Sequence, residues 1–218
     1  MENIKNKIIE VCQRLHDRNL LAAADGNVSV KEDTQTIWIT PTGQTKAFMD
    51  NRELACMTID NQIISGKPSS ERKLHLAIYK NCPTAKAVVH AHPPHAIAWS
   101  LAFGNMTELP YKSLPEVILA TGKIPIVPYA RPGSNEMGDS LLPFLPDHKV
   151  LIMQKHGAVA WGETLDEAYR GIERVEHISF ILKLAIELKN LKINLEELPT
   201  DEINELFAMR SQMGNFNL

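Results

Sequence analysis

Cysteine is scarce in this chain. Its 218 residues include only Cys12, Cys56 and Cys82, which are odd in number, far apart and in no C-x-x-C pattern. A framework of disulfides needs paired cysteines, so this pattern excludes one and favours a reducing compartment. We therefore expect a cytoplasmic protein.

Long apolar runs and an excess of basic charge are also missing. No run approaches the roughly 20 apolar residues of a membrane-spanning helix, and residues 1–5 lead directly into an amphipathic pattern, so we expect no signal peptide. With 23 basic and 26 acidic residues, the net charge of −3 gives no electrostatic case for nucleic acid or an anionic membrane as a partner. A hydrophobic fraction of 44% is typical of a soluble globular protein.

Hydrophobic spacing predicts an alternation of short strands and helices. The predicted helices cover residues 2–20, 48–54, 70–81, 96–101, 135–145, 164–191 and 200–209. The predicted strands or extended segments cover residues 28–30, 37–39, 55–59, 88–92, 150–153 and 158–161. Residues 104–115 show little pattern and predict a mobile loop. No internal repeat or low-complexity linker interrupts the chain, so we expect one α/β domain over residues 1–218.

Two helix starts carry recognisable caps. Ser134 precedes the predicted helix 135–145 as a candidate N-cap, and Thr164 and Glu167 have the spacing of a capping box. The polar tail beyond residue 209 predicts a frayed end.

Two histidines mark the stretch around which the chain is organised. The β-branched pair Val88-Val89 leads into His90-Ala91-His92, and Pro93-Pro94 follows. Side chains alternate across a strand, so His90 and His92 project to the same side at a strand end. Two imidazoles in this arrangement form half of a metal site.

A third histidine and a glutamate are candidates to complete that site. His156 follows the apolar strand 150–153, and three neutral imidazoles are a usual catalytic zinc set. The alternative is a strand-end histidine without a ligand role. Glu71 stands in the first turn of a helix, either as a carboxylate beside the metal or as part of an ordinary acidic first turn. His75 is a partner of Glu71 or a structural histidine, and His95 more simply starts a helix.

Three turns share a chemistry that suits a phosphate. Gly26-Asn27, Thr42-Gly43 and Ser69-Ser70 each offer backbone N–H groups and a small polar side chain. Such turns are common, so they carry weight only if the fold brings them together.

With these residues in hand, the sequence resembles the class II aldolase/adducin-head family, and within it the fuculose-1-phosphate aldolase branch. The motifs occur in the family's order and at about its spacing, over most of the chain. They are Gly26-Asn27-Val28-Ser29, Thr40-Pro41-Thr42-Gly43, Pro68-Ser69-Ser70-Glu71, Val89-His90-Ala91-His92 and Lys155-His156-Gly157.

The resemblance implies a fold and a set of partners. The fold is a single α/β domain with a mostly antiparallel central sheet flanked by helices, assembled as a homotetramer with active sites at subunit interfaces. Zinc is held by His90, His92 and His156, and three imidazoles also accept Mn²⁺ or Co²⁺. Glu71 is the acid/base. Residues matching Asn27, Thr42, Gly43, Ser69 and Ser70 hold the phosphate, with Gly26 in the first of these turns.

The reaction implied is the reversible cleavage of a ketose 1-phosphate to dihydroxyacetone phosphate and a small aldehyde, through a metal-stabilised enediolate. Glu71 exchanges a proton with the donor carbon. The main alternatives are a sugar-phosphate 4-epimerase, which carries aspartate in place of Glu71, and a methylthioribulose-1-phosphate dehydratase. Decarboxylases and the non-catalytic adducin head are further alternatives, and the three histidines speak against the latter.

The chain departs from the fuculose-phosphate pattern where the aldehyde half of the substrate would bind. Leu114 stands at the place of a family tyrosine, and residues 209–218 contain no tyrosine. Tyr111 and Glu116 are the candidate replacements. We therefore expect the sugar to differ from fuculose phosphate, with a less polar 5-deoxypentose or methylthio-sugar phosphate as alternatives.

Overall fold

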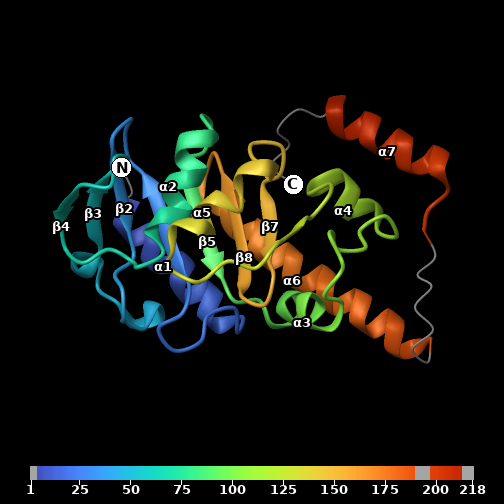
Figure 1. Ribbon diagram of the computed structural model, residues 1–218, viewed down its shortest axis with the longest axis horizontal. Coiled ribbons are helices and arrows are strands. Elements are labelled where there is room, and N and C mark those ends of the chain that lie inside the picture. The colour runs from blue at the N-terminus through green and yellow to red at the C-terminus, as the bar shows by residue number, and fades with distance from the viewer. Residues whose placement is uncertain (1–3, 190–196, 213–218) are drawn as a thin grey trace.

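The computed structural model describes residues 4–189 and 197–212, and its strands form one eight-stranded sheet with helices on both faces (Figure 1). The strand order is β4-β3-β2-β1-β5-β8-β7-β6. All neighbouring strands are antiparallel except β6 and β7, which are parallel. This sheet confirms the predicted α/β domain with a mostly antiparallel centre.

The strands are short, and six of the eight match the predicted positions closely, whereas β4 and β6 were not predicted as strands. Their bounds are β1 Asn27–Lys31, β2 Thr36–Ile39, β3 Ala55–Thr58, β4 Ile63–Ser65, β5 Ala87–Ala91, β6 Ile126–Val127, β7 Val150–Met153 and β8 Gly157–Gly162.

The helices lie between single strands and pairs of strands in the sequence, and α7 follows α6 directly. Their bounds are α1 Ile4–Asp17, α2 Arg72–Asn81, α3 Pro94–Ala102, α4 Pro115–Ala120, α5 Asn135–Asp139, α6 Leu165–Leu188 and α7 Thr200–Gln212, and the 3₁₀ turns are η1 Lys46–Phe48, η2 Asn51–Glu53 and η3 Leu142–Phe144.

The central strands are buried on both faces, which divides the core in two. In β5, Val89 packs into the cluster formed with α1, α3 and α6, whereas Val88 packs into the cluster formed with α2 and α5. Alternation along the strand therefore sends His90 to the α2 face together with Val88. The long helix α6 lies across the opposite face and packs against β5 and β8 (Figure 1).

Local chemistry explains where several predicted helices end. The first helix ends at Asp17, three residues before the predicted end, because Asn19 adopts a left-handed φ of 57°. The N–H of Leu20 then donates to the carbonyl of Leu15 at 2.9 Å, which is the closing bond of a Schellman motif.

Two further predicted helices break into shorter pieces. The segment 48–54 contains the 3₁₀ turns η1 and η2 instead of one helix, and 135–145 divides into α5 and η3. Ser134 stands at the predicted N-cap position of α5, but its hydroxyl donates to the carbonyl of Arg131 at 2.7 Å and makes no cap bond. The hydroxyl of Thr164 does accept from the N–H of Glu167 at 3.1 Å, as the capping-box spacing predicts.

No helix among residues 4–189 and 197–212 is both long and apolar enough to cross a membrane. The long helix α6 ends at Leu188, three residues before the predicted end. The tail predicted to fray after residue 209 is helical as far as Gln212, the end of α7. The predicted start of the first helix at residue 2 and the rest of the tail, 213–218, lie outside the described residues.

Candidate active site

The three predicted metal ligands converge on one point. Strand β5 carries His90, His92 follows one residue after the strand ends, and His156 lies in the turn between β7 and β8. Because β8 pairs with β5, this turn is brought beside the end of β5. The Nε2 atoms of His90 and His92 are 3.2 Å apart, and the ligand nitrogens of all three residues lie within 4.8 Å of one another.

Hydrogen bonding and burial prepare these imidazoles to bind a cation. His90 is fully buried, and its Nδ1 donates to the carbonyl of Ala158 at 2.9 Å, so its Nε2 presents a lone pair to the other two rings. Burial, together with the neighbouring His90 and His156, lowers the pKa of His92 to about 3. The His92 Nδ1 lies 3.6 Å from the Asp25 carboxylate. Three imidazole nitrogens that converge in this way fit a divalent cation such as zinc.

The turn that carries His156 depends on a glycine. Lys155 adopts a left-handed φ of 61°, and Gly157 begins β8 directly after His156. A Cβ at position 157 would lie 2.5 Å from the carbonyl oxygen of Ala91 and 2.9 Å from Cε1 of His90. Only a residue without a side chain therefore lets the β7–β8 turn approach the β5 histidines this closely.

The carboxylate of Glu71 faces the same three rings. Its Oε2 is 3.3 Å from His90 Nε2 and its Oε1 is 3.4 Å from His156 Nε2. Glu71 stands immediately before α2 and makes no side-chain cap bond to that helix, so it is not an ordinary capping residue. Burial acts to raise its pKa, but its contacts with His156 and His90 and the hydrogen bond from Asn27 outweigh burial and lower the pKa below its usual range.

The three predicted phosphate turns line one cavity of about 160 Å³, which we call the anion pocket. Backbone bonds hold the second and third turns together, from Thr42 N–H to the Lys67 carbonyl at 3.2 Å and from Ser69 N–H to the Thr40 carbonyl at 3.1 Å. All of the residues predicted to hold a phosphate line the pocket, namely Gly26, Asn27, Thr42, Gly43, Ser69 and Ser70. Glu71 and His92 line it too, so the anion pocket opens onto the histidine cluster.

Sequence reasoning missed one cation in this pocket. Lys46 lines the cavity although only 2% of the residue is exposed. Its Nζ donates to the carbonyls of Ala24 at 2.7 Å and Gln44 at 2.6 Å, and burial lowers its pKa. The available signal in the sequence was its position three residues after Gly43. No spacing rule distinguishes a buried lysine at such a position from a surface lysine.

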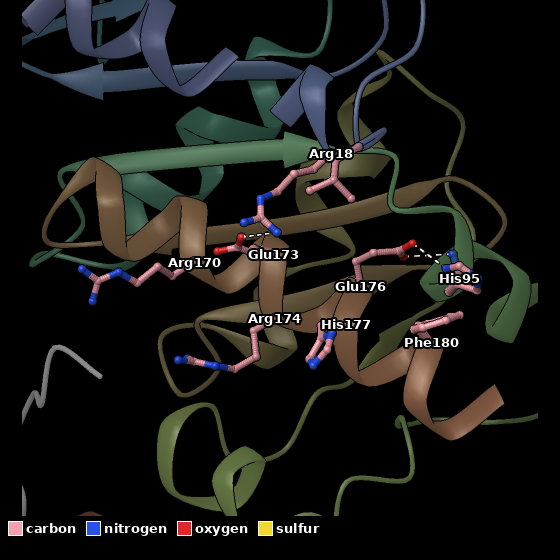
Figure 2. A pocket seen from close by; sticks show the side chains of 9 residues that line it. Arg18, His95, Arg170, Glu173, Arg174, Glu176, His177 and Phe180 are labelled. Carbon is pink, nitrogen blue, oxygen red and sulfur yellow. Dashed lines mark hydrogen bonds and ion pairs between the residues drawn. The ribbon is translucent and has the colours of Figure 1, made fainter. Parts of the chain in front are cut away.

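The other histidines singled out in the sequence do not join the cluster. His75 is fully buried on α2 and contacts Ser29 and Asn27, so its link to Glu71 is indirect. His95 is the second residue of α3, as predicted for a helix start, and its Nδ1 lies 2.7 Å from Glu176 Oε1 (Figure 2).

His95 borders a second, larger cavity of about 710 Å³, which we call the α6 groove (Figure 2). Its charged lining is already paired in part, because Arg18 lies 2.7 Å from Glu173 and Glu176 accepts from the His95 backbone N–H at 2.9 Å. Figure 2 shows these side chains projecting from α6, the turn after α1 and the start of α3.

The candidate residues for the aldehyde half lie apart from this cluster within one chain. Tyr111 is buried and stacks edge-on against Phe207 of α7, with ring centroids 6.5 Å apart, and burial raises its pKa. Glu116 is exposed in the first turn of α4. Their predicted contribution to a neighbouring subunit's site stays a prediction.

Comparison with known proteins agrees with this geometry. Residues 6–182 match the family described as "Class II Aldolase and Adducin N-terminal domain". The chain is 38% identical over 173 residues to an L-fuculose phosphate aldolase of Methanococcus vannielii, covering 79% of this chain and 92% of that protein. It is 32% identical over 207 residues to a 3-oxo-tetronate 4-phosphate decarboxylase of Pectobacterium atrosepticum, covering 94% and 93%.

Among solved structures, YgbL from Escherichia coli superposes with a TM-score of 0.84 at 30% identity, covering 94% of this chain and 97% of that one. A family match that spans residues 6–182, relatives above 30% identity over most of their length, and a histidine cluster suited to a metal all agree. The chain therefore belongs to the class II aldolase and adducin N-terminal domain family.

Proposed function

We propose that this protein is a metal-dependent aldolase that reversibly cleaves a ketose 1-phosphate to dihydroxyacetone phosphate and a small aldehyde. The observation that carries the proposal is the placement of Glu71, whose carboxylate touches two of the three clustered histidines and also lines the anion pocket. One side chain thus stands between a site for a cation and a site for a phosphate. A donor held at both ends would present its reacting carbon to that carboxylate.

The histidine cluster would hold the cation. His90, His92 and His156 supply three imidazole nitrogens, and zinc, Mn²⁺ or Co²⁺ suits such a set. A divalent cation bound there acts as a Lewis acid toward the ketone and hydroxyl oxygens of the donor.

The anion pocket would hold the phosphate. The positive φ values of Gly26 (67°) and Gly43 (72°) shape two of its three turns. Thr42, Ser69 and Ser70 line the cavity, and their hydroxyls would donate hydrogen bonds to a phosphate bound there. Lys46 adds the positive charge that the turns lack, since two of its three ammonium protons are used by backbone carbonyls and one remains.

Glu71 would move the proton. In cleavage the C3–C4 bond breaks, its electron pair stays on C3, the C4 hydroxyl loses its proton to solvent, and Glu71 passes to C3 a proton that its carboxylate takes up from solvent. In synthesis the same carboxylate removes that proton. Asn27 Nδ2 donates to Glu71 Oε2 at 2.8 Å and holds the carboxylate in place. No lysine Schiff base is needed.

A second candidate function is decarboxylation of a 3-oxo sugar-acid phosphate. It is favoured by the relative named 3-oxo-tetronate 4-phosphate decarboxylase, which aligns over 94% of this chain. In that reaction the bond to the carboxylate breaks, CO₂ leaves, and the electron pair again stays on a carbon beside a ketone. The phosphate pocket, the histidines and the proton delivered by Glu71 would serve both reactions.

One experiment separates these reactions. The zinc-loaded protein is incubated with dihydroxyacetone phosphate and a panel of short aldehydes, and loss of the donor is followed. A parallel reaction with 3-oxo-tetronate 4-phosphate is followed by CO₂ release. Condensation with at least one aldehyde supports the aldolase. CO₂ release without condensation supports the decarboxylase, and neither product overturns both.

The same samples address the remaining alternatives. Epimerisation of a pentulose 5-phosphate or loss of water from methylthioribulose 1-phosphate would replace the aldolase by the corresponding epimerase or dehydratase. We also propose that the protein forms a homotetramer in the cytoplasm, as the family resemblance implies. Light scattering on the purified protein measures the oligomeric state.

A further inference from the structure

A chain of buried hydrogen bonds continues inward from Glu71, away from the anion pocket. Asn27 contacts His75 through its Oδ1 and the ring Nε2. His75 Nδ1 lies 2.7 Å from Ser29 Oγ, and Ser29 Oγ lies 2.8 Å from the hydroxyl of Tyr79. None of these four residues is more than 3% exposed.

Sequence spacing explains how this chain forms. Asn27 and Ser29 stand two apart on β1, so both project to the α2 face of the sheet. His75 and Tyr79 stand four apart on α2, so they lie one above the other on the helix face that meets β1. The four side chains therefore interleave between one strand and one helix.

The direction of every bond in the chain is fixed by chemistry. The amide oxygen of Asn27 only accepts, so His75 Nε2 carries the proton and donates to it. The neutral ring then has a bare Nδ1, which accepts from the Ser29 hydroxyl. Because the Ser29 proton is directed at His75, the Ser29 oxygen in turn accepts from the Tyr79 hydroxyl. Burial keeps His75 neutral, lowering its pKa to about 3.

The outcome is that the NH₂ group of Asn27 faces Glu71 and the anion pocket. If His75 took the other tautomer, its bare Nε2 would face the amide oxygen of Asn27, and the amide would turn over to restore a hydrogen bond. The amide oxygen of Asn27 would then face the carboxylate of Glu71, which places two acceptors against each other.

We propose that Tyr79, Ser29 and His75 are positioning residues that lock the amide orientation of Asn27 and thereby hold Glu71 for proton transfer. This inference rests on the proposed function for its effect on turnover. The orientation itself is a property of the protein without substrate.

The kinetic test compares two tyrosines. Tyr79→Phe removes the hydroxyl at the far end of the chain and keeps the ring. Tyr169→Phe is the control, because Tyr169 is also fully buried and its side chain contacts Glu173 of α6 and Arg14 of α1, none of which belongs to the chain that leads to Asn27. We expect Tyr79→Phe to lower kcat about 10-fold at unchanged metal content, and Tyr169→Phe to change kcat less than about 2-fold. Equal kcat values for the two variants would overturn the proposal.

The spectroscopic test needs no turnover. In zinc-loaded protein labelled with ¹⁵N-histidine, the ring signals of His75, assigned by their loss in His75→Gln, report the tautomer. We expect the neutral Nε2–H form at pH 7, and a mixture of tautomers in Tyr79→Phe. A protonated ring or the Nδ1–H form in the wild-type protein would overturn the proposal whatever the enzyme does.

Ser29→Ala breaks the same chain one bond closer to His75 and replaces Tyr79→Phe if that variant fails to fold. A wild-type protein that turns over no substrate but shows the Nε2–H form would overturn the proposed function alone.

Discussion

The anion pocket and the α6 groove differ in size and in chemistry, and the smaller one holds the candidate active site. The groove has a volume of about 710 Å³ against about 160 Å³ for the anion pocket. In the groove, Arg18 is paired with Glu173 and His95 with Glu176 (Figure 2). In the pocket, hydroxyls and one ammonium group stand beside three imidazoles whose ring nitrogens point at one another. The candidate active site is thus identified by polar groups that converge on one point, and the volume of a cavity alone does not identify it.

The strongest test of this difference removes one histidine from the cluster beside the anion pocket and one from the α6 groove. His156→Ala should lose the bound cation and lower turnover by about 10³-fold or more, because two imidazoles hold a catalytic metal poorly and the Lewis acid is lost with it. His177→Ala removes an exposed histidine that lines the α6 groove and should keep both. Elemental analysis and turnover in added zinc measure the two effects. A cation retained by His156→Ala would contradict the assignment.

The next largest effect is expected at Glu71, whose carboxylate lies between the histidine cluster and the anion pocket. Glu71→Gln keeps the size of the side chain and removes the group that accepts a proton, so kcat should fall about 10²- to 10⁴-fold. Binding of zinc and of inorganic phosphate should remain. Glu173→Gln in the α6 groove is the matched control and should turn over normally. If Glu71→Gln turned over at the wild-type rate, another residue would have to move the proton.

A smaller effect is expected at the cation of the anion pocket. Lys46→Met keeps the length of the side chain and removes its charge, so KM for the phosphorylated donor should rise about 10-fold with kcat changed less than about 3-fold. Lys67→Met, an exposed lysine next to the third turn, is the control and should leave KM unchanged. A KM unaffected by loss of Lys46 would show that the phosphate binds elsewhere.

The smallest effect concerns stability against acid. The pKa of His75 is about 3 in the folded protein and near 6.5 when exposed. Between these values the unfolded chain binds a proton that the folded chain does not, so the free energy of unfolding falls as the pH falls, by up to about 1.4 kcal/mol per pH unit. Urea unfolding at pH 7 and pH 5 should show this loss.

A matched pair of variants assigns that loss to His75. His75→Gln should flatten the pH dependence between pH 7 and pH 5, whereas His177→Gln at the exposed position should preserve it. An unchanged slope in His75→Gln would show that other groups cause the acid sensitivity.

Much of the metal half of the site could be predicted because its information is local. A strand with histidines at alternate positions places both rings on one side whatever the rest of the fold does, and Nε2 atoms 3.2 Å apart bear this out. The third histidine could be predicted as a candidate from its place after an apolar strand. Only the pairing of β8 with β5 brings His156 beside His90 and His92. The hydrophobic periodicity of a sequence does not predict the order of strands in a sheet.

Other features depend on contacts that a linear pattern does not reveal. Lys46 folds back from η1 to reach the carbonyl of Ala24, which lies 22 positions earlier in the chain. The role of His75 depends on Asn27 and Ser29, which β1 supplies from nearly 50 positions away. The predicted helix over 135–145 stops at Asp139, and Ser134 bonds backward to Arg131 instead of capping it. In each case a tertiary or turn contact decided between several locally acceptable arrangements.

The closeness of Gly157 to the β5 histidines has a consequence for protein engineering. Transplanting only the three histidines onto another antiparallel sheet would not reproduce the site. A Cβ at the position of Gly157 would lie 2.5 Å from the carbonyl oxygen of Ala91 and would keep the turn that carries the third histidine away from the other two. The unit that must be transplanted is the segment His90-Ala91-His92 together with a glycine at the start of the neighbouring strand. Designs that include glycine at this fourth position should bind a divalent cation, and designs that place alanine there should not.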